Sequence, residues 1–93
     1  MEIVMQIDAD VQNRTVALVR SILEENSIVV EFDPESRLAD IGLTSMDMVN
    51  LMLGVEAEFD FTIPQSEITP ENFKSIATLQ KMIVRQLQAD KAA

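Results

Sequence analysis

The sequence has no cysteine and no histidine among its 93 residues. Without cysteine the chain can form no disulfide and offers no thiolate. Without histidine it has no serine–histidine pair for nucleophilic catalysis and no histidine ligand for a metal ion. A glycine-rich phosphate loop is missing as well. These absences predict that the protein is not an enzyme.

Turn-forming and aromatic residues are also scarce, with 2 Gly, 3 Pro and 4 Phe, and neither Tyr nor Trp. So few turn residues favour helices over a many-turned β sandwich. Because 47% of the residues are hydrophobic, we expect an ordered core, built from Ile, Val, Leu and Met. A chain of this length makes one small domain. We place it at residues 1–93, with a core from about 8 to 88 and a frayed tail at 89–93.

Basic residues are outnumbered by acidic ones, seven to sixteen, which gives a net charge of −9. Nucleic acids and anionic membrane surfaces are therefore disfavoured partners. Basic protein surfaces are favoured, although the charge can equally serve solubility alone. No apolar run approaches the roughly twenty residues of a membrane span, and the N-terminus lacks a signal-peptide pattern. We expect a cytoplasmic monomer.

Helical periodicity predicts an all-α bundle of three longer helices and one short one. The first helix starts at Asp8 or Asp10 and ends near Asn26, while residues 1–7 either extend it or pack loosely. A long connection follows at 27–43. The Asp33–Ser36 stretch of that connection is predicted to be a turn or a single helical turn. The inward positions of the first helix and the anchors of the connection are expected to be Val11, Thr15, Leu18, Val19, Ile22 and Leu23, and then Phe32, Leu38 and Ile41.

Capping residues mark the starts of three further predicted helices. Thr44 and Asp47 form a capping-box pattern for a helix that ends at Phe59. Thr69 followed by Pro70 predicts a short helix that ends near Lys74. Ser75 caps a last helix. The side chains expected to face the core from these helices are Val49, Leu53, Leu51 or Met52, Phe59, Ile76, Leu79, Ile83 and Leu87.

Ser45 is the candidate functional residue. If Thr44 caps the helix, then Ser45 is its first residue, and the backbone amides do not need its hydroxyl. The hydroxyl then stands at the positive end of the helix dipole, where a phosphate group is favoured. In the other interpretation, Ser45 is itself the cap and carries nothing.

A set of residues in order resembles the acyl carrier protein family. The set begins with the stretch Gly42-Leu43-Thr44-Ser45-Met46-Asp47 and continues through Val49, Leu51, Glu56, Phe59, Ile63-Pro64, Phe73, Ser75-Ile76 and Leu79. The resemblance covers residues 10–88. It implies a four-helix carrier fold and a 4′-phosphopantetheine arm, derived from coenzyme A, on Ser45. The run from Leu51 to Glu56 also resembles free-standing aminoacyl carrier proteins.

The family resemblance implies partners that do the chemistry. A phosphopantetheinyl transferase would attach the arm, a ligase or transferase would load an acyl or aminoacyl group as a thioester, and downstream enzymes would collect it. The family usually has Asp where this chain has Thr44 and Leu where it has Met46, which points to a dedicated pathway. The expected docking residues are Thr44, Met46, Asp47, Val49, Asn50, Glu56, Ile63 and Ile68. The competing hypothesis is an acidic helical interaction domain in which Ser45 stays unmodified.

Overall fold

The computed structural model describes the backbone of residues 2–92 and the side-chain environment of residues 7–89. Within that range the chain forms three α-helices and one short 3₁₀ helix: α1 (Glu2–Glu25), α2 (Ser45–Phe59), η1 (Gln65–Glu67) and α3 (Ile76–Ala92). No strand occurs among these residues, and Arg37 and Ser75 form only an isolated bridge. The all-α prediction is confirmed. No helix of the described chain is long and apolar enough to cross a membrane.

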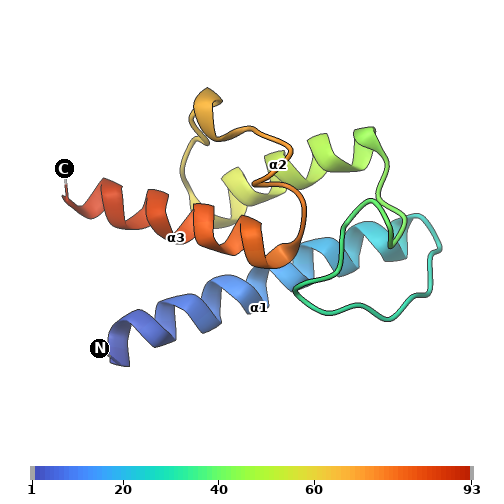
Figure 1. The fold of residues 1–93 in the computed structure, drawn as a ribbon, viewed down its shortest axis with the longest axis horizontal. Helices are drawn as coiled ribbons and strands as arrows, with labels where there is room; N and C mark the ends of the chain where they lie inside the picture. The colour runs from blue at the N-terminus through green and yellow to red at the C-terminus, as the bar shows by residue number, and fades with distance from the viewer. Residues whose placement is uncertain (1, 93) are drawn as a thin grey trace.

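Helix α1 is the element on which the other two helices pack. It contacts both α2 and α3, and the start of α1 and the end of α3 lie at the same end of the molecule (Figure 1). The connection between α1 and α2 curves around the opposite end (Figure 1). The start of α2, and with it Ser45, therefore lies at the end remote from the termini.

The core is aliphatic, as the composition predicts. The buried hydrophobic side chains are Val11, Val19, Ile22, Leu23, Leu38, Ile41, Leu43, Leu51, Val55, Phe59, Ile63, Ile76, Leu79, Met82 and Ile83. The predicted stripes of α1 and α3 are confirmed, except that Leu18 and Leu87 are only partly buried. Met82 is a further core residue, fully buried on α3.

The predicted inward face of α2 is wrong for Val49 and Leu53 and is confirmed for Leu51 and Phe59. Val49 and Leu53 are about half exposed, whereas Leu51 and Val55 are fully buried and Phe59 nearly so. Both sets repeat every four residues, so each makes an apolar stripe along a helix. The stripe of Leu51, Val55 and Phe59 faces the core because it continues from the buried Asp47.

The long connection is ordered by the turn and the anchors that the sequence predicts. The Asp33 carboxylate accepts a hydrogen bond from the Glu35 amide at 2.8 Å, and the Ser36 hydroxyl accepts one from the Asp33 amide at 3.0 Å. Leu38 and Ile41 are buried, and Phe32 packs partly against the core. Hydrogen bonds inside the turn and buried anchors beyond it therefore fix the path toward α2.

The segment 69–74 differs from the short helix that the sequence predicts. The Thr69 hydroxyl accepts a hydrogen bond from the Asn72 amide at 3.2 Å, as a helix cap would. The Phe73 amide then donates to the Thr69 carbonyl at 3.2 Å, but the backbone continues as turns and not as a regular helix. The regular short helix lies just before it, at η1.

The ends of the chain extend further as helix than the sequence indicates. Helix α1 begins at Glu2, so residues 2–7 extend it, which resolves the alternative left open above. Ser75 caps α3 as predicted, because its hydroxyl accepts a hydrogen bond from the Thr78 amide at 3.2 Å. Helix α3 continues to Ala92, whereas fraying of 89–93 is a matter of dynamics and stays a prediction.

The far end of α2 is tied to α1 by one side chain, Arg14. Its guanidinium donates to the carboxylates of Asp10 and Glu58 at 3.0 and 2.8 Å and to the Glu58 carbonyl at 2.6 Å. It also lies 4.4 Å from the centre of the Phe59 ring. In the middle of α2, a methyl group added at Gly54 would lie 3.4 Å from Leu18, so the two helices cross closely there.

Candidate functional site

Ser45 is exposed and is the first residue of α2. Thr44 caps this helix, since its hydroxyl accepts a hydrogen bond from the Asp47 amide at 3.2 Å. The capping role therefore belongs to Thr44, and the hydroxyl of Ser45 has no hydrogen bond to another described residue. Its position at a helix start is favourable for a negatively charged group.

The capping box is completed by Asp47. Its carboxylate accepts a hydrogen bond from the Thr44 amide at 2.9 Å and another from the Asn26 side-chain amide at 3.0 Å. These two bonds, the first above all, lower the pKa of Asp47 below its ordinary value, and burial opposes them. Asp47 therefore stays charged near neutral pH and holds the turn on which Ser45 stands.

Gly42 shapes the approach to Ser45. Its φ of +118° is one that other residues rarely adopt, and a methyl group added there would lie 2.9 Å from Ile28. Ile28 follows the end of α1, where its amide donates to the Leu23 carbonyl at 2.8 Å. The end of α1 therefore supports the chain just before the capping residue, as well as the cap itself.

Ser45 lies at the edge of an apolar groove of about 590 Å³. The groove runs between α2 and the segment 68–74, and we call it the α2 groove. Its lining residues are Arg37, Ala39, Ser45, Met48, Val49, Met52, Ile68, Thr69, Pro70, Phe73 and Lys74. A long, flexible group attached to Ser45 would find apolar side chains beside it.

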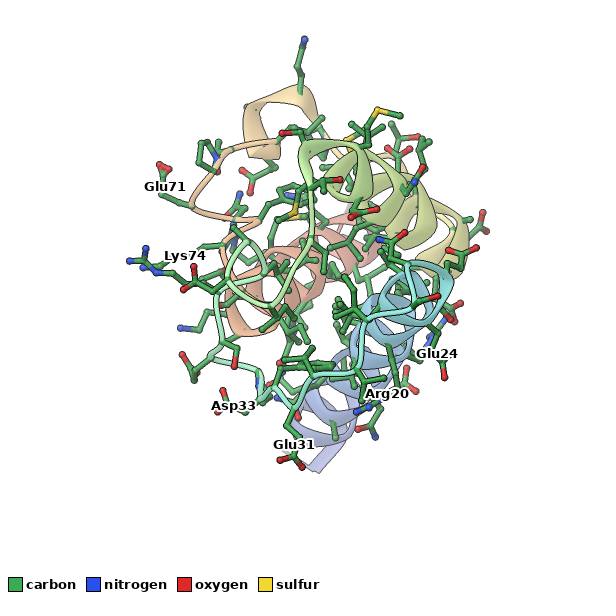
Figure 2. The ribbon with its side chains drawn as sticks, turned by 90° about the vertical axis from the view of Figure 1, so that its right-hand side faces the viewer. Arg20, Glu24, Glu31, Asp33, Glu71 and Lys74 are labelled. Atoms are coloured by element: carbon green, nitrogen blue, oxygen red, sulfur yellow. The ribbon has the colours of Figure 1, made fainter. Side chains whose placement is uncertain are left out.

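The wall of the α2 groove opposite the helix is held by polar contacts. The Asn72 side chain donates to the Glu67 carbonyl at 2.8 Å, and Arg85 of α3 donates to the Glu67 carboxylate at 2.8 Å. From the same segment, Glu71 and Lys74 extend outward into solvent (Figure 2). The wall is thus held by hydrogen bonds and an ion pair, and it carries charged side chains at the surface.

Beside Ser45, α2 presents apolar side chains to solvent. Met46 is 73% exposed, Val49 48% and Leu53 53%. Spacings of three and four residues place them on one side of the helix, which we call the outer stripe. Asn50 and Thr44 are exposed as well.

The structure places five of the eight predicted docking residues at the surface around Ser45. They are Thr44, Met46, Val49, Asn50 and Ile68, of which Ile68 is 44% exposed at the edge of the α2 groove. Of the remaining three, Asp47 and Ile63 are buried, and Glu56 is only partly exposed.

The expected exposed charge of Asp47 is wrong, because its side chain is only 8% exposed and serves the cap. The Glu56 carboxylate accepts a hydrogen bond from the Ile63 amide at 2.8 Å, so it secures the exit from α2. Ile63 is buried in the core. Each of these side chains thus has a contact inside the molecule.

Sequence reasoning missed Leu53 as a surface residue and missed the polar rim of the α2 groove, Arg37 and Lys74. For Leu53 the signal was ambiguous: its spacing of seven residues from Met46 places both on one side of the helix, but Leu51 and Val55 form a second apolar side with the same spacing as Val49 and Leu53. For Arg37 and Lys74 no signal was available. They come together because the backbone amide of Leu38 donates to the Lys74 carbonyl at 2.9 Å across a gap in the sequence.

Residues 13–83 match the family described as "Phosphopantetheine attachment site". The chain is 63% identical over 86 residues to Aminoacyl carrier protein 1 of Bradyrhizobium diazoefficiens, which is 92% of this chain and 96% of that protein. It is 59% identical over 78 residues to Aminoacyl carrier protein 2 of the same organism, 84% of this chain and 88% of that protein.

Two solved structures are similar in fold. One is the carrier protein in a complex with Bradyrhizobium japonicum glycine:[carrier protein] ligase and an analogue of glycyl adenylate. It has a TM-score of 0.72 and 64% identity, and the match covers 82% of this chain and 99% of that one. The other is a glycylated carrier protein with the same ligase, at a TM-score of 0.69 and 67% identity, covering 77% and 97%.

Proposed function

The chain belongs to the phosphopantetheine-dependent carrier proteins, the acyl and aminoacyl carriers, and we propose that it is an aminoacyl carrier whose arm is attached to Ser45 and loaded with glycine. The protein is a carrier and not an enzyme, and its cofactor is a covalently attached 4′-phosphopantetheine.

The observation that supports Ser45 as the attachment residue is that its hydroxyl does not cap α2. Thr44 makes the capping bond, so the exposed hydroxyl of Ser45 is available for a phosphodiester. A negative charge on that oxygen would be stabilised by the start of α2. The neighbouring α2 groove gives the attached chain an apolar surface to lie against. The residues present therefore fit the cofactor.

When attached, the arm supplies the thiol that holds the aminoacyl group as a thioester. The chain itself has no cysteine that could do so. The work of its own residues is positional. Thr44 and Asp47 fix the turn that bears Ser45, and the outer stripe offers a partner an apolar surface within one to two turns of the serine.

The proposed loading partner is an amino-acid-activating ligase that uses glycine. The support is the pair of similar carriers, each solved with a glycine:[carrier protein] ligase and 64 to 67% identical to this chain. We propose that the ligase contacts Met46, Val49 and Leu53 together with Thr44 and Asn50. We also propose a cytoplasmic monomer that is modified by a phosphopantetheinyl transferase and unloaded by downstream acyl-accepting enzymes.

The attachment site is tested by incubating the apo chain with coenzyme A and a transferase of broad specificity. Mass spectrometry of the intact chain and of its peptides should show the gain of one arm, on Ser45. Ser45→Ala should gain none. Ser66→Ala is a matched control, because Ser66 is also an exposed serine but lies on η1 and not at the start of α2. This variant should be modified like the wild type. An arm on another residue would contradict the assignment.

The amino acid is tested on the holo chain with a glycine-activating carrier protein ligase and ATP. A glycyl group on the arm, released by hydroxylamine as a thioester would be, is expected. Alanine or a fatty acid offered to their own ligases should give little product by comparison. Loading by a fatty acyl ligase in preference to the glycine ligase would overturn the aminoacyl proposal and leave the carrier assignment in place.

A further inference from the structure

The side chain of Asn26 lies next to the residues that hold Ser45, although 18 residues lie between Asn26 and Ser45 in the sequence. Asn26 comes directly after α1, and its side-chain amide donates to the Asp47 carboxylate at 3.0 Å. The oxygen that it contacts, Oδ2, is the same one that accepts the Thr44 amide at 2.9 Å. The end of α1 and the start of α2 therefore share one acceptor atom.

The geometry of this contact is fixed by the backbone on both sides. The Asn26 amide donates to the Ile22 carbonyl at 3.1 Å, which holds it against the last turn of α1. Ser27 follows with a φ of +58°, which turns the chain sharply away. The Asn26–Asp47 bond therefore links the end of α1 to the first turn of α2.

An aspartate in a capping box has a short reach, so its orientation matters. Glutamate is the usual partner at this position because it is long enough to reach back to the capping residue. Asp47 is one methylene shorter and is nearly buried, at 8% exposed. A second donor that holds its carboxylate toward Thr44 would offset that shorter reach.

We propose that Asn26 is a positioning residue for the modification of Ser45. By orienting the Asp47 carboxylate, it keeps the capping box closed and so holds the Ser45 hydroxyl in the direction that an incoming transferase requires. Asn26 itself does not touch the arm or the reacting atoms. The proposal rests on the proposed function for its enzymatic consequence, while its structural part can be tested on the apo chain alone.

The test variant is Asn26→Asp, which keeps the size of the side chain but replaces the donating amide with a carboxylate that faces Asp47. Asn26→Ala removes the donor without adding charge. Asn13→Asp is the matched control, because it makes the same change at an exposed position within α1, away from Asp47 in sequence. All measurements are made at a temperature where circular dichroism shows each variant to be folded.

Hydrogen exchange of the Thr44 amide is the structural measurement. In both Asn26 variants it should be about tenfold faster than in the wild type, the size expected for weakening one hydrogen bond to a charged group. Amides in the core of α3, such as those of Leu79 and Ile83, should keep their wild-type rates. Thr44 and α3 amides that accelerate together would show a loss of global stability and would overturn the proposal.

Transfer of phosphopantetheine is the functional measurement. The kcat/KM of a broad transferase should fall about tenfold in both Asn26 variants, since a small misplacement of a reacting group costs this much or more, and Asn13→Asp should match the wild type. Wild-type rates in both Asn26 variants would overturn the proposal. A wild type that accepts no arm would refute the proposed function instead, and the exchange of the Thr44 amide would then judge Asn26 by itself.

Discussion

The two sides of α2 are both apolar, yet they have opposite environments. Leu51, Val55 and Phe59 are buried against α1 and α3, whereas the outer stripe of Met46, Val49 and Leu53 is 48 to 73% exposed. Burying an aliphatic side chain stabilises a fold by about 1.5–3 kcal/mol. The side chains of the outer stripe are too exposed to contribute this full stabilisation. A contiguous exposed apolar strip marks a surface that other molecules contact. One side of the helix thus serves folding, and the other is the side on which we propose that partners dock.

The largest effect should come from matched truncations on the two sides. Leu51→Ala is expected to lower the free energy of unfolding by about 2–5 kcal/mol, because it opens a cavity in a fully buried site. Leu53→Ala, the same change two residues away, should lower it by less than about 1 kcal/mol. Urea denaturation followed by circular dichroism measures both. Equal losses would remove the distinction between the two sides.

The outer stripe should show its role in loading and not in folding. Val49→Asp places a charge in a surface that a ligase would bury, so we expect loading of the holo chain to fall about tenfold or more, the cost of burying an unpaired charge. The denaturation midpoint should stay near that of the wild type. Ala57→Asp, also exposed on α2 but further from Ser45, is the control and should load normally. Normal loading by Val49→Asp would show that the ligase binds elsewhere.

The capped start of α2 should make the fold sensitive to acid. Two hydrogen bonds lower the pKa of Asp47 in the folded chain relative to its ordinary value of about 4. Its contribution is therefore fully present above that ordinary value and is lost as the pH falls through the lower, folded pKa. Asp47→Asn should be less stable at pH 7 and should depend less on pH between about 5 and 2. An unchanged acid profile would mean that other carboxylates dominate.

The smallest effect is expected where the buried side of α2 meets α1 most closely. Gly54→Ala removes the conformational cost of glycine in a helix, about 1 kcal/mol. The new methyl group would lie 3.4 Å from Leu18, which is an ordinary contact distance. We expect a gain in the free energy of unfolding of less than about 1 kcal/mol, measured by urea denaturation. A loss instead would show that the crossing of α1 and α2 tolerates no added atom.

Local capping chemistry made much of the fold predictable. The box of Thr44 and Asp47, the cap at Ser75 and the turn from Asp33 to Ser36 each depend on atoms within three residues of one another. Such bonds follow from residue type and spacing alone. The position of Ser45 at the first turn of α2 was predictable for the same reason.

The inward side of α2 was not predictable, because its apolar residues occur all around the helix. Val49 with Leu53 and Leu51 with Val55 have equal spacing, and only packing on α1 and α3 distinguishes them. The contact of Asn26 with Asp47 spans 21 residues and depends on how two helices meet. The segment 69–74 has a hydrogen bond typical of a helix cap, but its backbone forms turns that lead into α3 instead of a regular helix. Long-range packing decides all three, and sequence patterns do not contain it.

Helix α2 is held at both ends, by Asn26 on Asp47 at its start and by Arg14 on Glu58 and Phe59 at its finish. Both ends of α2 are therefore fixed to α1 or to the residue that follows it, and the outer stripe lies between these two contacts. A protein that binds this side contacts a preorganised surface, so binding costs less conformational entropy than it would at a flexible one. The enzymes that we propose as partners would therefore each contact the same preformed surface.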